Sequence, residues 1–212
     1  VGRDLVRRVA SDFGIQSDLA AGPALALGAS ESSLLEMTGA FAGILNGGSS
    51  VTPFGLIELS LLGDDEPLMG TGGGIEERVI QESSARQLTW MMEKVVSQGT
   101  GKRAQFEGRE IAGKTGTTQG ARDAWFIGFT GDYVAGVWMG YDDNTKLRGV
   151  TGGGLPADIW RETMQRVHAG VPAKPLPMQA PAALQQSVTQ PTVALRRERS
   201  QRNVIENLLL DL

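Results

Sequence analysis

The string Ala112-Gly-Lys-Thr-Gly-Thr-Thr118 contains the residues of this sequence that are best suited to chemistry. Lys114 can place a cation beside a nucleophile or a substrate carboxylate, and the hydroxyls of Thr115 and Thr117 can hydrogen-bond that carboxylate. Gly116 has no Cβ, so a bound chain can approach the backbone closely there. The amide of Thr117 can point at a developing oxyanion, an interaction worth about 3–4 kcal/mol in comparable sites. These residues predict a wall that binds carboxylate and oxyanion.

The same residues also satisfy the pattern of a phosphate-binding loop. Gly108 to Thr115 reads Gly-x-x-x-x-Gly-Lys-Thr, which matches the nucleotide-binding signature in full. That signature works only where a buried strand enters the loop and a helix begins at the Lys-Thr pair, because the helix amides bind the phosphates. The residues before Gly108 do not form a buried strand, and the glycines and β-branched threonines of 116–120 oppose a helix. A nucleotide site is therefore kept only as an alternative.

Residue patterning around the string favours a strand over a helix. Ile111–Thr118, Asp123–Thr130 and Tyr133–Tyr141 are strand-like and are separated by short glycine-containing turns, which predicts an antiparallel meander. A strand that borders a cleft can bind an extended peptide by backbone pairing. Ser33 and Glu36 form a capping box before one of the predicted helices. Helical periodicity covers residues 1–13, 34–45, 82–96 and 156–169.

Composition excludes several classes of site. The chain contains no cysteine and a single histidine, His168, so it offers neither thiol chemistry nor a zinc site built on several histidines. His168 ends the last helical pattern, where we expect it to interact with the negative end of that helix. The net charge of -4 is mild and no Lys/Arg run indicates a nucleic-acid partner. The longest apolar-rich stretch, Tyr133–Tyr141, is far shorter than the roughly 20 residues that a membrane helix needs.

Further motifs flank the Lys-Thr-Gly string in a fixed order. They are Gly39-Ala-Phe-Ala42, Asn46-Gly-Gly48, Ser97-Gln-Gly-Thr-Gly101, Asp123-Ala-Trp-Phe-Ile-Gly128, Trp138-Met-Gly140 and Gly152-Gly153. A Lys-Thr-Gly alone is a weak signal of the penicillin-recognising serine enzymes, but the ordered set is specific. Over residues 1–170 the chain resembles the transpeptidase domain of class A penicillin-binding proteins, the bifunctional cell-wall synthases.

The sequence departs from that family in its serines. Such enzymes use a Ser-x-x-Lys nucleophile and a Ser-x-Asn motif, both located before the Lys-Thr-Gly strand. No serine here has Lys three residues later or Asn two residues later. The first helical pattern also begins at Val1 without a capping residue. We therefore expect the chain to be the C-terminal part of a transpeptidase domain and to be inactive alone.

The resemblance implies an α/β (α+β) fold of the β-lactamase/transpeptidase type, with an antiparallel sheet packed against helices and incomplete at the N-terminus. Residues 1–170 are then the C-terminal portion of the transpeptidase domain. Residues 171–192, rich in Pro, Ala and Gln, are expected to be a linker. Residues 193–212 form a tail whose pattern, charged early and apolar late, is that of a short helix.

The resemblance further implies a peptidoglycan D,D-transpeptidase with an acyl-serine mechanism, which cross-links stem peptides ending in D-Ala-D-Ala and is acylated by β-lactams. Lys114 and the Thr117 amide would be catalytic, substrate would bind Thr115, Gly116, Thr117 and Thr118, and no metal or organic cofactor is implied. The parent protein would carry a glycosyltransferase domain and act at the periplasmic face of the inner membrane, held there by parts outside this chain. A non-catalytic cell-wall or partner-binding module on the same scaffold stays open as an alternative.

Overall fold

The computed structural model describes residues 2–63, 66–70 and 72–182. The chain divides into two compact units, Val1–Gln179 and Ala180–Leu212. The helices, the strands and the site described below belong to the first unit. The tail in which a short helix is expected, residues 193–212, lies outside the described residues.

The α-helices of the first unit begin and end close to their predicted limits. They are α1 (Arg3–Asp12), α2 (Leu34–Leu45), α3 (Glu82–Ser97) and α4 (Leu155–Val167), and two short 3-10 helices occupy Pro23–Leu27 and Lys102–Ala104. The predicted capping box opens α2: the amide of Glu36 donates to Ser33 Oγ at 3.2 Å, and the Ser33 amide donates to the Glu36 carboxylate at 3.0 Å. In the part of the chain that the structure describes, no helix is both long and apolar enough to cross a membrane.

The predicted meander is a three-stranded antiparallel sheet. It consists of β3 (Ala112–Thr117), β4 (Ala124–Phe129) and β5 (Val134–Met139) in the spatial order β3-β4-β5, so β3 lies at an edge. A separate antiparallel pair joins β1 (Ser49–Thr52) to β2 (Gly74–Arg78). The sequence does not predict this pairing, because a long segment separates the two strands and their pairing is not local.

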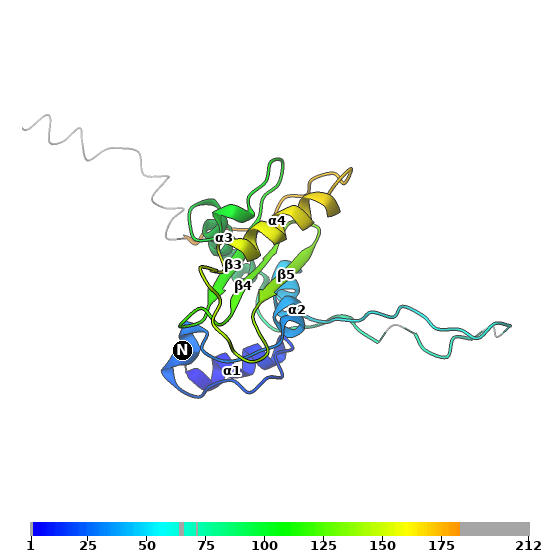
Figure 1. The fold of residues 1–212 in the computed structure, drawn as a ribbon. Coiled ribbons are helices and arrows are strands. Elements are labelled where there is room, and N and C mark those ends of the chain that lie inside the picture. Colours follow the sequence, from blue (N-terminus) through cyan, green and yellow to red (C-terminus); the bar gives the residue numbers. More distant parts are fainter. Residues whose placement is uncertain (1, 64–65, 71, 183–212) are drawn as a thin grey trace, which may run out of the picture. The chain divides into compact units, whose positions relative to one another are not determined.

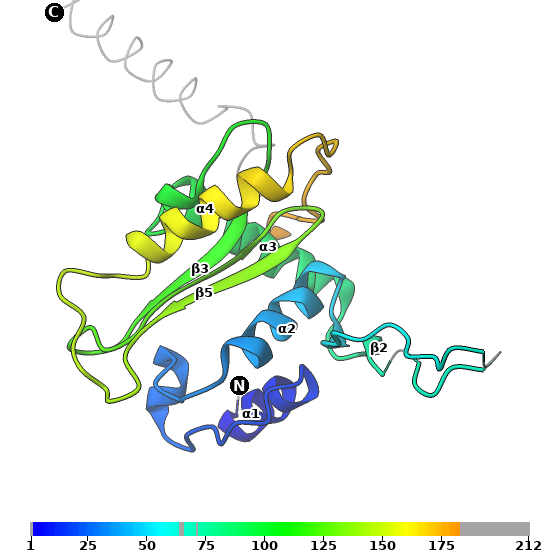
Figure 2. The same ribbon diagram turned by 45° about the vertical axis from the view of Figure 1, so that its right-hand side comes forward.

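Helices cover both faces of the sheet (Figure 2). Side chains of β4 contribute to the core on each side. Phe126 points to α4, where its ring meets that of Trp160 edge-on with the centroids 5.3 Å apart. Ile127 and Phe129 point to the other face, where they pack in one cluster with Phe41 of α2. All five side chains are buried. The alternation is that of a strand whose two faces are both covered.

Residues 171–179, which we call the strap, belong to the first unit, so this unit extends beyond the boundary expected at residue 170. Leu176 of the strap is buried, and its amide donates to the Glu110 carboxylate at 2.8 Å. The amide of Gln179 donates to the carbonyl of Arg86 in α3 at 3.0 Å. The Pro- and Ala-rich composition is typical of a linker, but these contacts hold the strap against the domain.

Candidate functional site

The Lys-Thr-Gly string lies extended in the edge strand β3. Lys114 to Thr117 pair with Ala124 to Ile127 of β4 in regular antiparallel register. A phosphate-binding Lys-Thr pair must open a helix, because the amides of the helix N-terminus bind the phosphates. The phosphate-loop interpretation is therefore wrong, since the pair lies within a strand.

The free edge of β3 presents the amides and carbonyls of every second residue. The Thr118 amide donates to the carbonyl of Asp123, its register partner, at 3.1 Å. In an antiparallel ladder this bond fixes the alternation, so Gly116 and Lys114 also bond to β4. Thr117 and Thr115, one residue out of phase, direct their amides and carbonyls away from β4. The Thr117 amide thus faces outward, as an oxyanion donor must.

The side chains of the string divide between the two faces of the sheet. Thr115 pairs with Phe126, so Thr115 and Thr117 lie on the face that α4 covers. Lys114 pairs with Ile127 on the opposite face, yet its Nζ donates to the outward carbonyl of Thr115 at 2.7 Å. The ammonium consequently reaches the free edge of the strand. The Lys114 ammonium reaches this edge from one face of the sheet and the threonine hydroxyls lie on the other face, while the Thr117 amide points outward from the edge itself.

Each of the two threonine hydroxyls has a partner within the domain. Thr115 Oγ1 shares a hydrogen bond with Thr100 Oγ1 at 2.7 Å, and Thr117 Oγ1 accepts from the Gly152 amide at 3.0 Å. Because Thr117 Oγ1 accepts this bond, its own proton stays available to donate to a bound group. Sequence reasoning placed Thr100 and Gly152 in motifs without a role, since no local pattern reveals contacts across 15 and 35 residues.

The turn Thr151–Gly154 lies against β3, and its glycines allow this approach. A Cβ on Gly152 would overlap the carbonyls of Trp125 and Gly116 and would lie 2.9 Å from the Gly116 amide nitrogen. A Cβ on Gly153 would overlap the carbonyl of Thr100. The turn leads directly into α4. It therefore joins that helix to the strand that carries the predicted site residues.

Thr118, which the sequence predicts to bind substrate, lies just past β3 in the turn to β4. Its hydroxyl accepts from the amides of Arg122 at 3.1 Å and Asp123 at 2.8 Å. The Asp123 carboxylate accepts from Trp138 Nε1 at 3.0 Å, and the rings of Trp138 and Trp125 lie 6.3 Å apart. The Thr118 hydroxyl thus supports the turn, and its contact with substrate stays a prediction.

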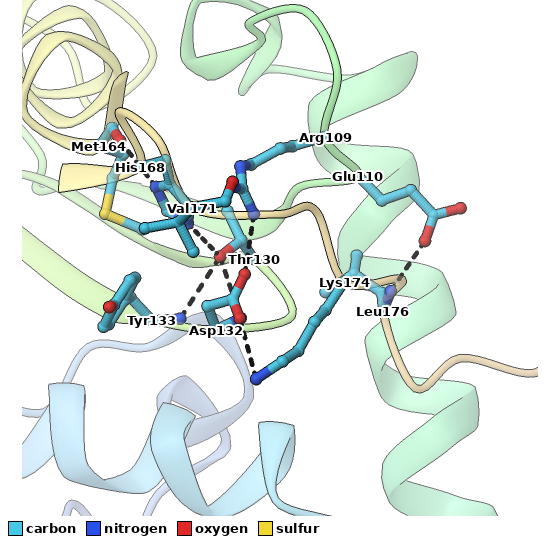
Figure 3. Close-up of polar contacts among 10 residues, drawn as sticks. All are labelled: Arg109, Glu110, Thr130, Asp132, Tyr133, Met164, His168, Val171, Lys174 and Leu176. Atoms are coloured by element: carbon cyan, nitrogen blue, oxygen red, sulfur yellow. Dashed lines mark hydrogen bonds and ion pairs between the residues drawn. The ribbon is translucent and has the colours of Figure 1, made fainter. Parts of the chain in front are cut away.

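A buried polar network lies at the end of β4 that is remote from Thr117 (Figure 3). His168 follows α4, and its Nδ1 donates to the carbonyl of Met164 at 2.7 Å. Thr130 Oγ1 accepts from the amides of Asp132 and Tyr133 and shares a hydrogen bond with His168 Nε2 at 2.9 Å. His168 meets the end of its helix as expected and takes no part in the candidate site.

Asp132, between β4 and β5, links this network to the strap (Figure 3). Its carboxylate contacts Arg109 at 2.8 Å, with both side chains only 6% exposed, and Lys174 at 3.1 Å. The hydrogen bond and charge of Lys174, followed by those of Arg109, hold the pKa of Asp132 below its ordinary value. Arg109 also donates to the Val171 carbonyl. Among the described residues, no group of three His, Asp or Glu side chains is arranged to hold a metal ion.

Comparison with known families identifies the family and the fold of this chain. The family model of the penicillin binding protein transpeptidase domain matches residues 11–171. The chain belongs to this family. The match covers the sheet, α2, α3 and α4, and all the predicted site residues.

The curated relatives are penicillin-binding proteins whose chains are longer than this one. Penicillin-binding protein 1A of Aquifex aeolicus is 33% identical over 168 residues, which are 79% of this chain and 23% of the relative. Penicillin-binding protein 1B of Escherichia coli is 35% identical over 134 residues, covering 61% of this chain and 16% of the relative. The chain thus spans less than a quarter of the length of either relative.

Solved penicillin-binding proteins have the same fold. Penicillin-binding protein 1A from Haemophilus influenzae superposes with a TM-score of 0.70 at 25% identity, over 82% of this chain and 32% of that one. PonA1 from Mycobacterium tuberculosis also superposes with a TM-score of 0.70, at 24% identity, over 81% of this chain and 50% of that one. The fold class expected from the sequence, an antiparallel sheet packed against helices as in transpeptidases, is confirmed.

Within the transpeptidase domain, the predicted site residues Lys114, Thr115, Gly116 and Thr117 form one continuous stretch of a sheet edge, in which Lys114 and Thr117 are exposed and the two residues between them are half-buried. Thr100 and the turn Thr151–Gly154 support it from the side of α4. The roles assigned to these residues stay predictions.

Proposed function

We propose that this chain is part of a peptidoglycan D,D-transpeptidase and that β3 forms the carboxylate- and oxyanion-binding wall of its acyl-transfer site. The observation that supports this most is the free edge of β3. There the Thr117 amide turns outward next to the Lys114 ammonium, which reaches the Thr115 carbonyl at 2.7 Å. Three kinds of donor suited to an anionic peptide terminus share one strand.

The substrate in this proposal is a stem peptide ending in D-Ala-D-Ala. It would lie extended along β3 and pair with the outward groups of Thr115 and Thr117, as a strand added to a sheet edge does. The terminal carboxylate would accept hydrogen bonds from the Thr115 and Thr117 hydroxyls, within reach of Lys114. Gly116 would leave space for the substrate backbone. The Gly152 amide would keep the Thr117 proton directed to substrate.

In the reaction, a serine hydroxyl attacks the carbonyl carbon of the penultimate D-Ala. The carbonyl oxygen becomes an oxyanion that the Thr117 amide stabilises, by about 3–4 kcal/mol for one such donor. The intermediate expels terminal D-Ala as the protonated amine and leaves an acyl-serine, and the amine of a second stem peptide then displaces the serine. No serine of the 212 residues has the Ser-x-x-Lys pattern, so we propose that the nucleophile comes from outside them.

The proposal extends to inhibitors and location. Penicillin-binding protein A of M. tuberculosis, 25% identical with a TM-score of 0.58, has been solved as an imipenem acyl-enzyme complex. By the same chemistry, β-lactams would acylate the serine that completes this site. We further propose that the parent protein works on the periplasmic face of the inner membrane, as the resemblance to class A penicillin-binding proteins implies.

Fluorescent penicillin tests the proposal on the gene product that contains this chain. The wild-type protein should be labelled, and Lys114→Gln should slow acylation about ten- to hundredfold, because a hydrogen bond to a charged group contributes about 1.5–3 kcal/mol. Lys102→Gln, an exposed lysine in the 3-10 helix Lys102–Ala104, is the matched control and should react at the wild-type rate. The 212-residue chain by itself should stay unlabelled. A folded wild-type gene product that takes no label would contradict the enzyme and favour a non-catalytic cell-wall module.

A further inference from the structure

The segment between β1 and β2 is unusually apolar for exposed chain. It runs out from the sheets in both ribbon views (Figures 1 and 2), and the Leu59 amide donates to the Met69 carbonyl across it at 2.9 Å. Five large side chains along it, and Ile75 at the start of β2, are between 46% and 72% exposed; the five are Phe54, Leu59, Leu61, Leu68 and Met69. We call these six residues the apolar arm.

An exposed ribbon of this kind is unfavourable unless something covers it. A lone exposed leucine is ordinary, but soluble proteins rarely expose contiguous apolar patches beyond a few hundred Å², and such patches mark interaction sites. A two-stranded ribbon is at best marginally stable in water without a further strand or a packed face. The apolar arm therefore has the properties of a docking surface.

The charges around the arm indicate the kind of partner. No Lys or Arg occurs between Arg8 and Arg78, and Glu58 and Glu66 are exposed along the arm. In β2 beside it, Glu76 and Glu77 outnumber Arg78, and all three are exposed. Such an acidic surface is repelled by nucleic-acid phosphates and by anionic lipid headgroups. Two arms laid against each other would also set carboxylates against carboxylates, which disfavours pairing of identical copies.

We propose that the apolar arm binds a protein partner whose contact surface is apolar at its centre and rich in Lys or Arg at its rim. An apolar centre within a polar rim is the ordinary anatomy of protein interfaces. The opposite charges would steer the encounter and reject acidic surfaces. This proposal rests on exposure and charge alone, so it stands or falls separately from the transpeptidase site.

Binding of labelled model peptides to the 212-residue chain tests the chemistry. A short peptide alternating Leu and Lys should bind about tenfold tighter than its Ser/Lys or Leu/Glu counterparts, and added salt should weaken it. The double variant Leu59→Ser/Leu68→Ser should lose about tenfold in affinity or more, because two apolar contacts are removed. Leu27→Ser, at an 88% exposed leucine outside the arm, is the control. Equal binding by the double variant, or by the Ser/Lys peptide, would overturn the proposal.

Two further experiments test the charge of the arm and the kind of partner that it binds. Glu58→Gln/Glu66→Gln alters only exposed carboxylates and should weaken the Leu/Lys peptide without changing the unfolding midpoint. In cells, a photo-crosslinking residue in place of Leu61 in the gene product should capture a protein segment that is apolar and rich in Lys or Arg. Capture of lipid, of a second arm or of an acidic segment, or no capture, would count against the proposal.

Discussion

The hydroxyls of Thr115 and Thr117, at the edge of β3, each have a hydrogen-bond partner that orients them. Thr100 Oγ1 lies 2.7 Å from Thr115 Oγ1, and the Gly152 amide lies 3.0 Å from Thr117 Oγ1. A hydroxyl has one proton, so an internal donor that fills one of its acceptor positions decides where that proton goes. Thr100 would act as such a donor toward Thr115 and would be a positioning residue, since it acts through Thr115.

Replacing Thr100 with Val tests this role while keeping the shape of the side chain. The second-order rate constant for acylation of the gene product by fluorescent penicillin should fall about fivefold, because a neutral hydrogen bond contributes about 1 kcal/mol. The effect should appear in the concentration dependence more than in the limiting rate, since Thr115 is proposed to bind the carboxylate. Thr100→Ser should restore the wild-type rate. If Thr100→Val slows acylation and Thr115→Val does not, the pair does not act as proposed.

Among the described residues, Glu36 is a carboxylate with many hydrogen-bond donors outside the site. It accepts from the Ser17 hydroxyl at 2.6 Å, the Ser32 hydroxyl at 3.0 Å and the amides of Gln16, Ser17 and Ser33 at 2.9 to 3.1 Å. The Ser17 hydroxyl, the Ser33 amide and the other donors lower its pKa from 4.5 to about 2. The carboxylate thereby attaches the segment after α1 to the start of α2.

The lowered pKa of Glu36 fixes the sign of a pH effect. The folded state favours the ionised carboxylate, so its contribution to stability is complete above pH 4.5 and disappears as the pH falls toward 2. Glu36→Gln should lower the free energy of unfolding by about 1 kcal/mol at neutral pH. The difference from wild type should shrink below pH 4.5 in urea titrations. Glu31→Gln, at an exposed position, should change neither quantity, and a constant difference down to pH 2 would refute the assignment.

Local elements of the fold could be predicted from sequence, and contacts between distant elements could not. The Ser33–Glu36 capping box and the three strands of the meander follow from residues close in sequence, and both are found. The pairing of β1 with β2 and the seating of the turn Thr151–Gly154 on β3 depend on residues far apart in the chain. The Lys-Thr-Gly residues were predictable because their motif is local, whereas Thr100 was not.

At the scale of elements, the turn Thr151–Gly154 should tolerate no side chain. Gly152→Ala should cost about 1–3 kcal/mol of unfolding free energy, since the new methyl would overlap backbone atoms of Gly116 and Trp125. Acylation of the gene product should slow as well, because the displaced Gly152 amide no longer orients Thr117. Gly22→Ala, where a Cβ would have no neighbour within 4 Å, is the control for urea midpoints. A Gly152→Ala protein as stable as wild type would contradict the close packing.

At the scale of the whole first unit, the sheet has a covered face on each side and a strap at one end. The strap is fixed by Leu176 in the core, by the Lys174–Asp132 pair and by the Arg109 bond to Val171. Its composition predicts a linker because prolines and alanines outnumber the apolar side chains that reveal packing. Leu176 and Met178 of the strap pack with the core, and two such side chains are too few to give a periodic pattern in the sequence.

The strap therefore gives the last prediction, on where the folded unit ends. A chain that stops at residue 170 should have a lower urea midpoint than one that stops at residue 182, because it loses the contacts of Leu176 and Lys174. Leu176→Ala in the full chain should cost about 2–5 kcal/mol, the range for a leucine removed from a packed core. Leu35→Ala, at a 65% exposed leucine on α2, is the matched control. Equal midpoints for the two truncated chains would make residues 171–179 the linker that their composition suggests, and would confine the cooperative unit to the residues before them.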